Sequence, residues 1–210
     1  MARIDKGILG PVSGSVGTIV GANWKGIDYI RSKSSGKRSS TVEQIDQQLK
    51  FSVAINFVST MTNLLRQTFN AYADKKSESN AALSYTLLNA ITGTSPDYAI
   101  DFSKALVSRG ALSNVTAPAA TVTGKVLHFT WTDNTGLGDA AATDQAVLVA
   151  YCKNFNTTTF TIGAAVRSDK AATLDVANYS GFPAEVWIAF MKADGSASSN
   201  SIFIGEITIG

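Results

Sequence analysis

The sequence is poor in the residue types that most enzymes use for catalysis and for metal binding. Its 210 residues include one cysteine, Cys152, and one histidine, His128. A single cysteine excludes a disulfide within the chain, and one cysteine with one histidine cannot supply a zinc ligand set. No Gly-x-Ser-x-Gly nucleophile motif is present. We therefore expect a protein that is not an enzyme and that has no cofactor and no metal site.

The surroundings of these two residues favour structural roles. His128 alternates with Leu127 and Phe129 in a strand-like run, so it is expected to face solvent, and no carboxylate is suggested nearby to orient it as a general base. Cys152 lies in the apolar run VLVAYCKN, which predicts a buried and unreactive thiol.

Charge and long apolar runs are scarce as well. Charged residues make up 16% of the chain, below the usual quarter of a globular protein. The first ten residues have no continuous apolar segment of the secretory type. Residues 7–24 are uncharged, but six of these 18 are Gly or Pro, which excludes a spanning helix there. We expect a protein made in the cytoplasm without a signal peptide, with no membrane partner; a place in a virion or an extracellular assembly is compatible with this.

The few charges are unevenly distributed. Residues 1–40 hold seven Lys or Arg against two Asp, residues 41–110 hold six of each sign, and residues 111–210 hold five basic against eight acidic residues. A basic front and an acidic rear favour head-to-tail attraction between copies or contact with an anionic partner. Ordinary scatter explains the numbers equally well.

The first forty residues are rich in glycine and then in basic side chains. The glycines lack the Gly-Lys-Ser/Thr ending of a phosphate-binding loop, and they are expected to permit close backbone contact. The segments 16–24 and 26–32 predict two strands, with Ile19, Trp24, Ile27 and Tyr29 as packing residues.

The basic residues of this region favour an arm that docks on acidic neighbouring subunits. Nucleic-acid binding is less favoured, because the net charge is only +2 and no binding motif surrounds them.

The middle of the chain predicts helices. Ser40 and Glu43 fit a capping box, and apolar residues at three-to-four spacing predict one amphipathic helix over about 41–74. A shorter helix is expected over 79–92, with Gly93 at its C-cap. Alternation over 98–103 then predicts a strand, for which the N-terminal hairpin is one candidate partner.

The last hundred residues predict an antiparallel β-sandwich. Six or seven short strands follow one another with turn signals between them, and the position of Trp131 is similar to the fibronectin type III plan. The predicted fold is therefore α+β: an N-terminal β-hairpin and extended arm with a helical hairpin (1–110), followed by an immunoglobulin- or fibronectin-III-like sandwich (111–210).

Two other kinds of site are possible in the sandwich. Asp133, Asp139 and Asp144 lie in one loop segment and are a weak calcium candidate, although turn chemistry explains them as well. The same segment is an end loop suited to binding glycan or protein. Tyr179, Phe182 and Trp187 are the aromatic candidates for such a module, with Trp187 expected in the core.

The pattern GxVGxxVGxxWKGxxYIRS, followed by SSTVEQIDQQLKF, DFSKALVSRGAL and the sandwich, resembles an uncharacterised family common in the Bacteroidota. A looser resemblance, over residues 14–75, is to phage structural proteins with an Arg-rich arm and a Thr-x-x-Gln helix start. Here these positions include Arg31, Thr41 and Gln44. The arm is sparser in basic residues than in those proteins, which counts against a nucleic-acid role. Neither resemblance implies a catalytic residue.

These observations together predict a non-enzymatic structural protein, a virion or filament subunit, that assembles with copies of itself or with other structural proteins through its N-terminal region. The alternative is a glycan- or protein-binding module that uses the sandwich end loops. The residues expected at the assembly interface are Gly14, Gly17, Gly21, Trp24, Lys25, Tyr29, Arg31, Lys33, Lys37 and Arg38.

Overall fold

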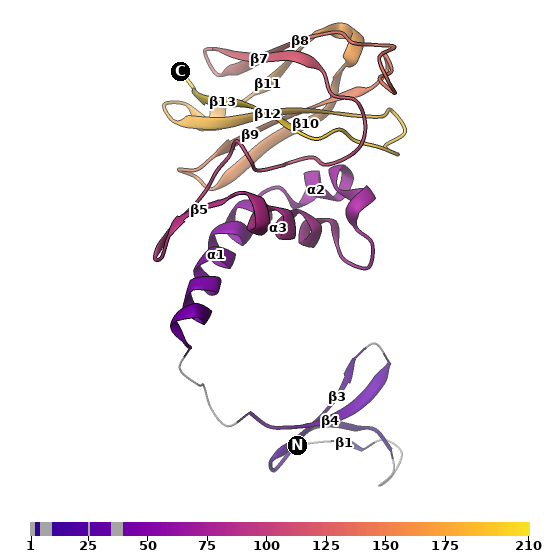
Figure 1. The fold of residues 1–210 in the computed structure, drawn as a ribbon, viewed down its shortest axis with the longest axis vertical. Coiled ribbons are helices and arrows are strands. Elements are labelled where there is room, and N and C mark those ends of the chain that lie inside the picture. The colour runs from indigo at the N-terminus through magenta and orange to yellow at the C-terminus, as the bar shows by residue number, and fades with distance from the viewer. Residues whose placement is uncertain (1–2, 5–9, 25, 35–39) are drawn as a thin grey trace. The chain divides into compact units, whose positions relative to one another are not determined.

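A computed structural model describes residues 3–4, 10–24, 26–34 and 40–210 of the chain. Contacts divide the molecule into two compact units, residues 1–42 and residues 43–210. Both helices and antiparallel sheets are present (Figure 1), as the predicted α+β class requires. The division lies at residue 42, whereas the sequence suggested a boundary at residue 110. An independently folding domain over 111–210 therefore stays a prediction.

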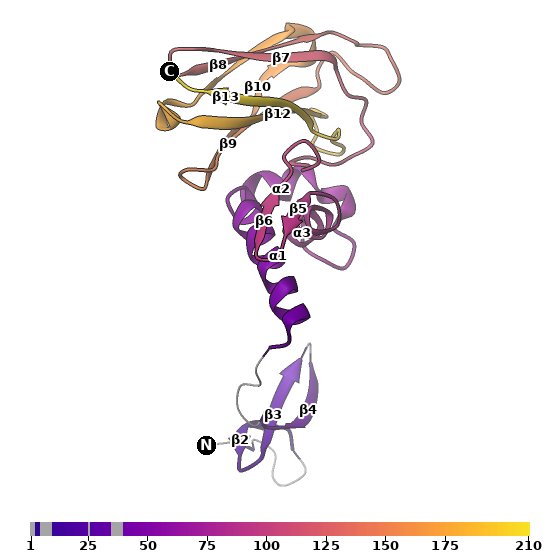
Figure 2. The same cartoon turned by 60° about the vertical axis from the view of Figure 1, so that its left-hand side comes forward.

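The first unit, which we call the N-terminal unit, contains one antiparallel sheet in the order β1-β2-β3-β4 (β1 is labelled in Figure 1 and the other three strands in Figure 2). Its strands are β1 (Arg3–Ile4), β2 (Val12–Val16), β3 (Ile19–Trp24) and β4 (Ile27–Ser32). Gly17, with φ +56°, lies between β2 and β3, and Gly26, with φ +84°, lies between β3 and β4. Positive φ is the region that glycine enters without strain, which explains why the chain reverses at these two points. The hairpin expected from the sequence is thus present in β3 and β4.

The second unit begins with a helical layer. It consists of α1 (Val42–Ser59), α2 (Thr62–Thr68), the single-turn η1 (Asn70–Tyr72) and α3 (Glu78–Asn89). The prediction of one helix over 41–74 is wrong, because the helix is interrupted at Thr60 and Met61. The amides of these two residues bond back three residues, to Phe57 O (3.3 Å) and Val58 O (3.2 Å), as in a tightened turn. The Thr60 hydroxyl also donates to Phe57 O (2.8 Å), and such local bonding competes with a continuous helix.

A small hairpin follows α3 and corrects two predictions. Gly93, expected at a helix C-cap, lies instead in β5 (Ile91–Thr94) with φ +94°, and Ala90 occupies the cap. A side chain at Gly93 would collide with the carbonyl oxygen of Asp97, so the close pairing of the hairpin requires glycine there. The strand expected over 98–103 is β6 (Asp97–Ile100), and it pairs with β5 and not with the N-terminal hairpin.

The remaining strands form two antiparallel sheets. One has four strands in the order β10-β9-β12-β13 and the other has three in the order β11-β8-β7. The six strands expected from the sequence are all present, and the segment before them is a seventh strand. Their bounds are β7 (Thr116–Thr123), β8 (Val126–Thr132), β9 (Gln145–Cys152), β10 (Thr157–Val166), β11 (Ala171–Asp175), β12 (Pro183–Met191) and β13 (Ile202–Thr208), with single turns η2 (Arg167–Asp169) and η3 (Ala177–Tyr179).

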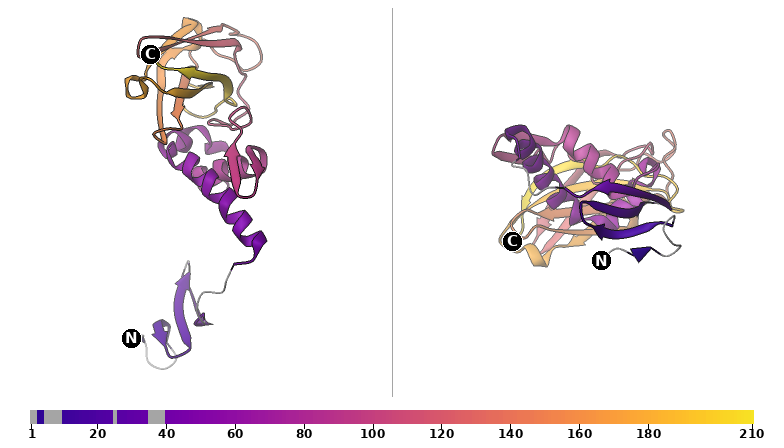
Figure 3. Two further views of the ribbon diagram at one scale, coloured as in Figure 1. Left: turned by 90° about the vertical axis from the view of Figure 1, so that its left-hand side faces the viewer. Right: turned by 90° about the horizontal axis from the view of Figure 1, so that it is seen from below.

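The four-stranded sheet is covered on both faces (Figures 1 and 3). In β9, Leu148 and Ala150 belong to the core shared with the three-stranded sheet, whereas Val149 and Tyr151 belong to the core shared with the helical layer. Successive side chains of a strand point to opposite faces, so a strand between two layers must be apolar throughout, as QAVLVAYC is. The three layers therefore share two cores, and the helical layer packs on the sheet and not beside it.

Candidate assembly interface

The N-terminal unit presents apolar side chains to solvent. In the register of β3 and β4, Trp24 lies opposite Ile27, Ala22 opposite Tyr29, and Val20 opposite Arg31. Residues directly opposite each other lie on one face of a sheet. We call this surface the aromatic face. The exposed fractions are 62% for Trp24 and 63% for Ile27, so two side chains that the sequence proposed as packing residues are mostly exposed to solvent.

Strand β4 is an edge of this sheet. All six of its residues are exposed, and in the part of the chain that the structure describes its one strand partner is β3. An edge strand with exposed apolar side chains is a template for pairing with another chain, and natural proteins usually protect such edges. In β4 the protection is limited to Asp28 and Arg31.

The three glycines of the predicted interface have structural roles within the sheet. Gly14, with φ +101°, lies opposite Gly21 in the register of β2 and β3. A side chain at Gly21 would collide with the carbonyl oxygen of Val12. The close backbone approach expected from the glycine pattern therefore occurs between strands of this unit, and Gly17 forms the turn between them.

The predicted basic residues are only partly described. Arg31 is exposed on the aromatic face, and Lys33 is exposed just beyond β4, where its amide donates to Thr18 O (2.7 Å). Lys25, Lys37 and Arg38 lie outside the described residues. The structure thus brings Trp24, Tyr29 and Arg31 together on one surface.

The second unit contains a pocket of about 220 Å³ where the helical layer meets the four-stranded sheet, and we call it the sheet-face pocket. Three aromatic side chains form its floor: Phe57 of α1, Phe102 of the loop after β6, and Tyr151 of β9. The distances between the centroids of each pair of rings are 5.1–5.8 Å. Asn56 and Lys153 supply polar groups in its lining. Sequence reasoning did not identify it, because its residues are separated by up to a hundred positions.

Next to this pocket, two glutamates form what we call the carboxyl pair. Glu185 lies opposite Tyr151 on one side and opposite Glu206 on the other, so all three share the helix-facing side of the sheet. Glu185 is half-buried and Glu206 is exposed. The one signal in the sequence is a lone carboxylate inside each of two apolar runs, AEVWIAF and FIGEITI.

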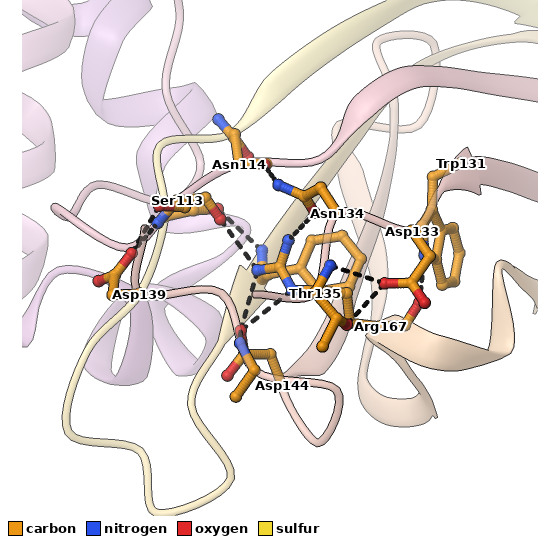
Figure 4. A network of polar contacts seen from close by, with 12 residues as sticks. Ser113, Asn114, Trp131, Asp133, Asn134, Thr135, Asp139, Asp144 and Arg167 are labelled. Atoms are coloured by element: carbon orange, nitrogen blue, oxygen red, sulfur yellow. Dashed lines mark hydrogen bonds and ion pairs between the residues drawn. The ribbon is translucent and has the colours of Figure 1, made fainter. Parts of the chain in front are cut away.

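The loop that includes Asp133, Asp139 and Asp144 is held by hydrogen bonds and an ion pair (Figure 4). Asp133 accepts from Thr135, Asp139 accepts from Ser113, and Asp144 pairs with Arg167. The Thr135 hydroxyl lowers the pKa of Asp133, and the Ser113 hydroxyl lowers that of Asp139. Within the described residues no group of three potential metal ligands is present. The carboxylates bond to separate donors, which favours turn chemistry over calcium binding.

Arg167 is the centre of this network and was not identified from the sequence. Its side chain is fully buried, donates to Asp144 Oδ2 (3.0 Å), Asn134 Oδ1 (2.7 Å) and Ser113 O (2.9 Å), and lies 4.5 Å from the centre of the Phe190 ring. It therefore ties three segments of the chain together.

The other candidates from the sequence are mostly buried. Tyr179 and Trp187 are 1% and 0% exposed, so only Phe182 of the three proposed binding aromatics reaches solvent, where it contacts Phe155. Cys152 is buried as expected. His128 is half-buried on β8 between Thr121 and Thr173 of the neighbouring strands.

Comparisons with known proteins identify a family but no activity. The search of curated proteins finds no match. The crystal structure of a beta-1,2-glucanase from Parabacteroides distasonis is similar with a TM-score of 0.33 and 13% identity, over 49% of this chain and 14% of the glucanase. None of the described helices is both long enough and apolar enough to cross a membrane. The match that extends over the greater part of the sequence is to a family model, at residues 11–205, and on that match the chain belongs to DUF6266, a family of unknown function.

Proposed function

We propose that the chain is a non-enzymatic structural protein, a virion or filament subunit, that assembles with copies of itself through its N-terminal unit. The observation that carries the proposal is strand β4, an exposed sheet edge that presents Ile27, Tyr29 and Ile30 to solvent. Addition of a strand to such an edge provides backbone hydrogen bonds, and the exposed side chains provide the apolar contact area.

The charge distribution supports association between copies. Residues 1–42 carry seven basic and two acidic residues, and residues 43–210 carry eleven basic and fourteen acidic residues. The two units therefore have opposite net charge, +5 and −3. Opposite charge on two surfaces speeds their encounter and disfavours contact between like units, which favours a head-to-tail arrangement that can continue through many copies.

For residues 111–210 we propose an immunoglobulin- or fibronectin-III-like sandwich that acts as a spacer or display module. Support comes from the strand order: the first, second and fifth strands form one sheet, and the other four form the second sheet. Trp131 on the second strand contacts Phe190 across the shared core.

The experiment that tests assembly compares the full chain with a version that lacks residues 1–40, by light scattering and negative-stain microscopy. We expect regular particles or fibres from the full chain and a monomer from the shortened one. A monomeric full chain at all accessible concentrations would refute the proposal.

A further inference from the structure

The carboxyl pair is an unfavourable arrangement when the chain is alone. Glu185 and Glu206 lie directly opposite each other on β12 and β13, and like charges in this position are destabilising. Burial first, and then the charge and hydrogen bond of Glu206, raise the pKa of Glu185 to about 7. Lys153 acts in the other direction but does not restore the ordinary value. A further cation beside the pair would relieve the repulsion.

The sheet-face pocket lies next to this pair. Tyr151 belongs to the floor of the pocket and is also the cross-strand neighbour of Glu185. From Tyr151 to Glu206 is two strand spacings, or about 10 Å. One surface of the second unit therefore offers an aromatic cavity at one end and the two carboxyl groups at the other.

The aromatic face of the N-terminal unit has the complementary pattern. Trp24 and Ile27 lie at one end, and Arg31 lies four residues along β4, about 13 Å away at the rise of a β-strand. The apolar and charged ends are about 10 Å apart on the sheet surface and about 13 Å apart on the aromatic face. Trp and Arg side chains that fill desolvated pockets are common anchors of protein interfaces.

We propose that the aromatic face of one copy docks on the sheet-face pocket of a second copy, with Trp24 in the pocket and Arg31 beside the carboxyl pair. This inference rests on the proposed self-assembly and names the surface that receives the N-terminal unit. The guanidinium of Arg31 replaces a repulsion between carboxylates by two charge-assisted hydrogen bonds. The indole of Trp24, mostly exposed in the single chain, loses its contact with water.

A charge exchange tests the contact between Arg31 and the carboxyl pair. Both R31E and the double variant E185K/E206K should raise the concentration needed for assembly about tenfold or more, because each places like charges together. The triple variant R31E/E185K/E206K should restore assembly, because it reverses the sign of both surfaces. The matched control is D74K, a reversal at an exposed position away from the pocket, which should leave assembly unchanged.

Tryptophan fluorescence tests the contact between Trp24 and the pocket without relying on the charge variants. Trp131 and Trp187 are 5% and 0% exposed, so quenching by iodide reports mainly on Trp24. Assembly of the full chain should shift the emission to shorter wavelength and protect it from iodide. W24A should weaken assembly about tenfold or more, whereas L137A, which removes an exposed side chain from a distant loop, should not.

The outcomes separate this inference from the proposed function. Suppose that the full chain assembles and that removal of residues 1–40 abolishes assembly. If the triple variant then fails to assemble, or if Trp24 stays accessible to iodide in the particles, the proposed docking surface is wrong and self-assembly stands. If the full chain never assembles, both are wrong. Thermal unfolding of each variant shows whether the second unit is still folded.

Discussion

At the scale of single residues, Arg167 depends strongly on its neighbours, because its buried guanidinium needs hydrogen-bond acceptors and a counter-ion. A fully buried guanidinium loses its hydration, and the loss is tolerable only when its N–H groups find partners. Here the partners are a carboxylate, an amide oxygen and a backbone carbonyl, and the Phe190 ring packs against the guanidinium. These contacts tie the loop between β8 and β9, which is rich in Gly, Ala and Asp, to the segments that contain Ser113 and Arg167.

Removal of the Asp144 carboxylate should show how far the stability of the folded chain depends on its ion pair with Arg167. D144A leaves a buried charge without its counter-ion, and it should lower the free energy of unfolding by about 3–5 kcal/mol. Denaturant unfolding of the variant measures the change. D194A is the control, since Asp194 lies in an exposed turn where it accepts from the hydroxyl and the amide of Ser196, and its loss should change the free energy of unfolding much less. Equal effects of the two variants would contradict a central role for the ion pair.

At the scale of elements, the N-terminal sheet depends on Gly21. A methyl group there would collide with the Val12 carbonyl, which is backbone and cannot move aside without shifting β2. G21A should therefore disrupt the sheet and weaken assembly about tenfold or more. The thermal unfolding of residues 43–210 should be unchanged, because they have their own cores.

Light scattering and calorimetry on the full chain measure the two effects of G21A separately. S15A, on the neighbouring strand at an exposed position, is the matched control and should assemble normally. Normal assembly of G21A would show that the order of this sheet is not needed for association.

The elements also show which features a sequence reveals. The six strands from β8 to β13 were predicted because alternation and turn residues are local signals. The interruption at Thr60 was not, because apolar spacing continues through it and the Thr60 hydroxyl also contacts Thr158, almost a hundred residues away. The apolar run of β9 predicted that Cys152 is buried, but it could not indicate that helices cover one face of the sheet.

The candidate site also shows that local sequence patterns reveal some surfaces and miss others. Trp24, Tyr29 and Arg31 were identified because they lie close together in the sequence. The pocket on the second unit was missed because Phe57, Phe102 and Tyr151 come from three elements that only tertiary packing brings together. A local pattern can reveal a surface made from one hairpin, whereas a surface made from a helix, a loop and a sheet has no local pattern.

At the scale of the whole molecule, pH should act on folding and on assembly in opposite directions. The pKa of Glu185 rises from 4.5 to about 7 in the folded chain. The folded state therefore binds this proton more tightly than the unfolded state, and the contribution to stability falls as pH rises from 4.5 to about 7. Docking of Arg31 instead favours the ionised carboxylate. It should release a proton near neutral pH and become stronger as pH rises.

We therefore predict that assembly weakens as pH falls from 8 to 6, by up to about tenfold per pH unit below the pKa of Glu185, the limit for one linked proton. Light scattering at constant ionic strength measures the concentration needed for assembly at each pH.

The groups that face Glu185 are Glu206 on β13, Tyr151 on β9 and Lys153 just beyond it. E185Q carries no titrating group at this position, so its assembly should be weak at pH 8 and change little down to pH 6. Unfolding does not account for weaker assembly at pH 6, because protonation of Glu185 makes the folded state more stable. An assembly that is indifferent to pH in this range, or that has the same pH dependence in E185Q, would place the carboxyl pair outside the interface.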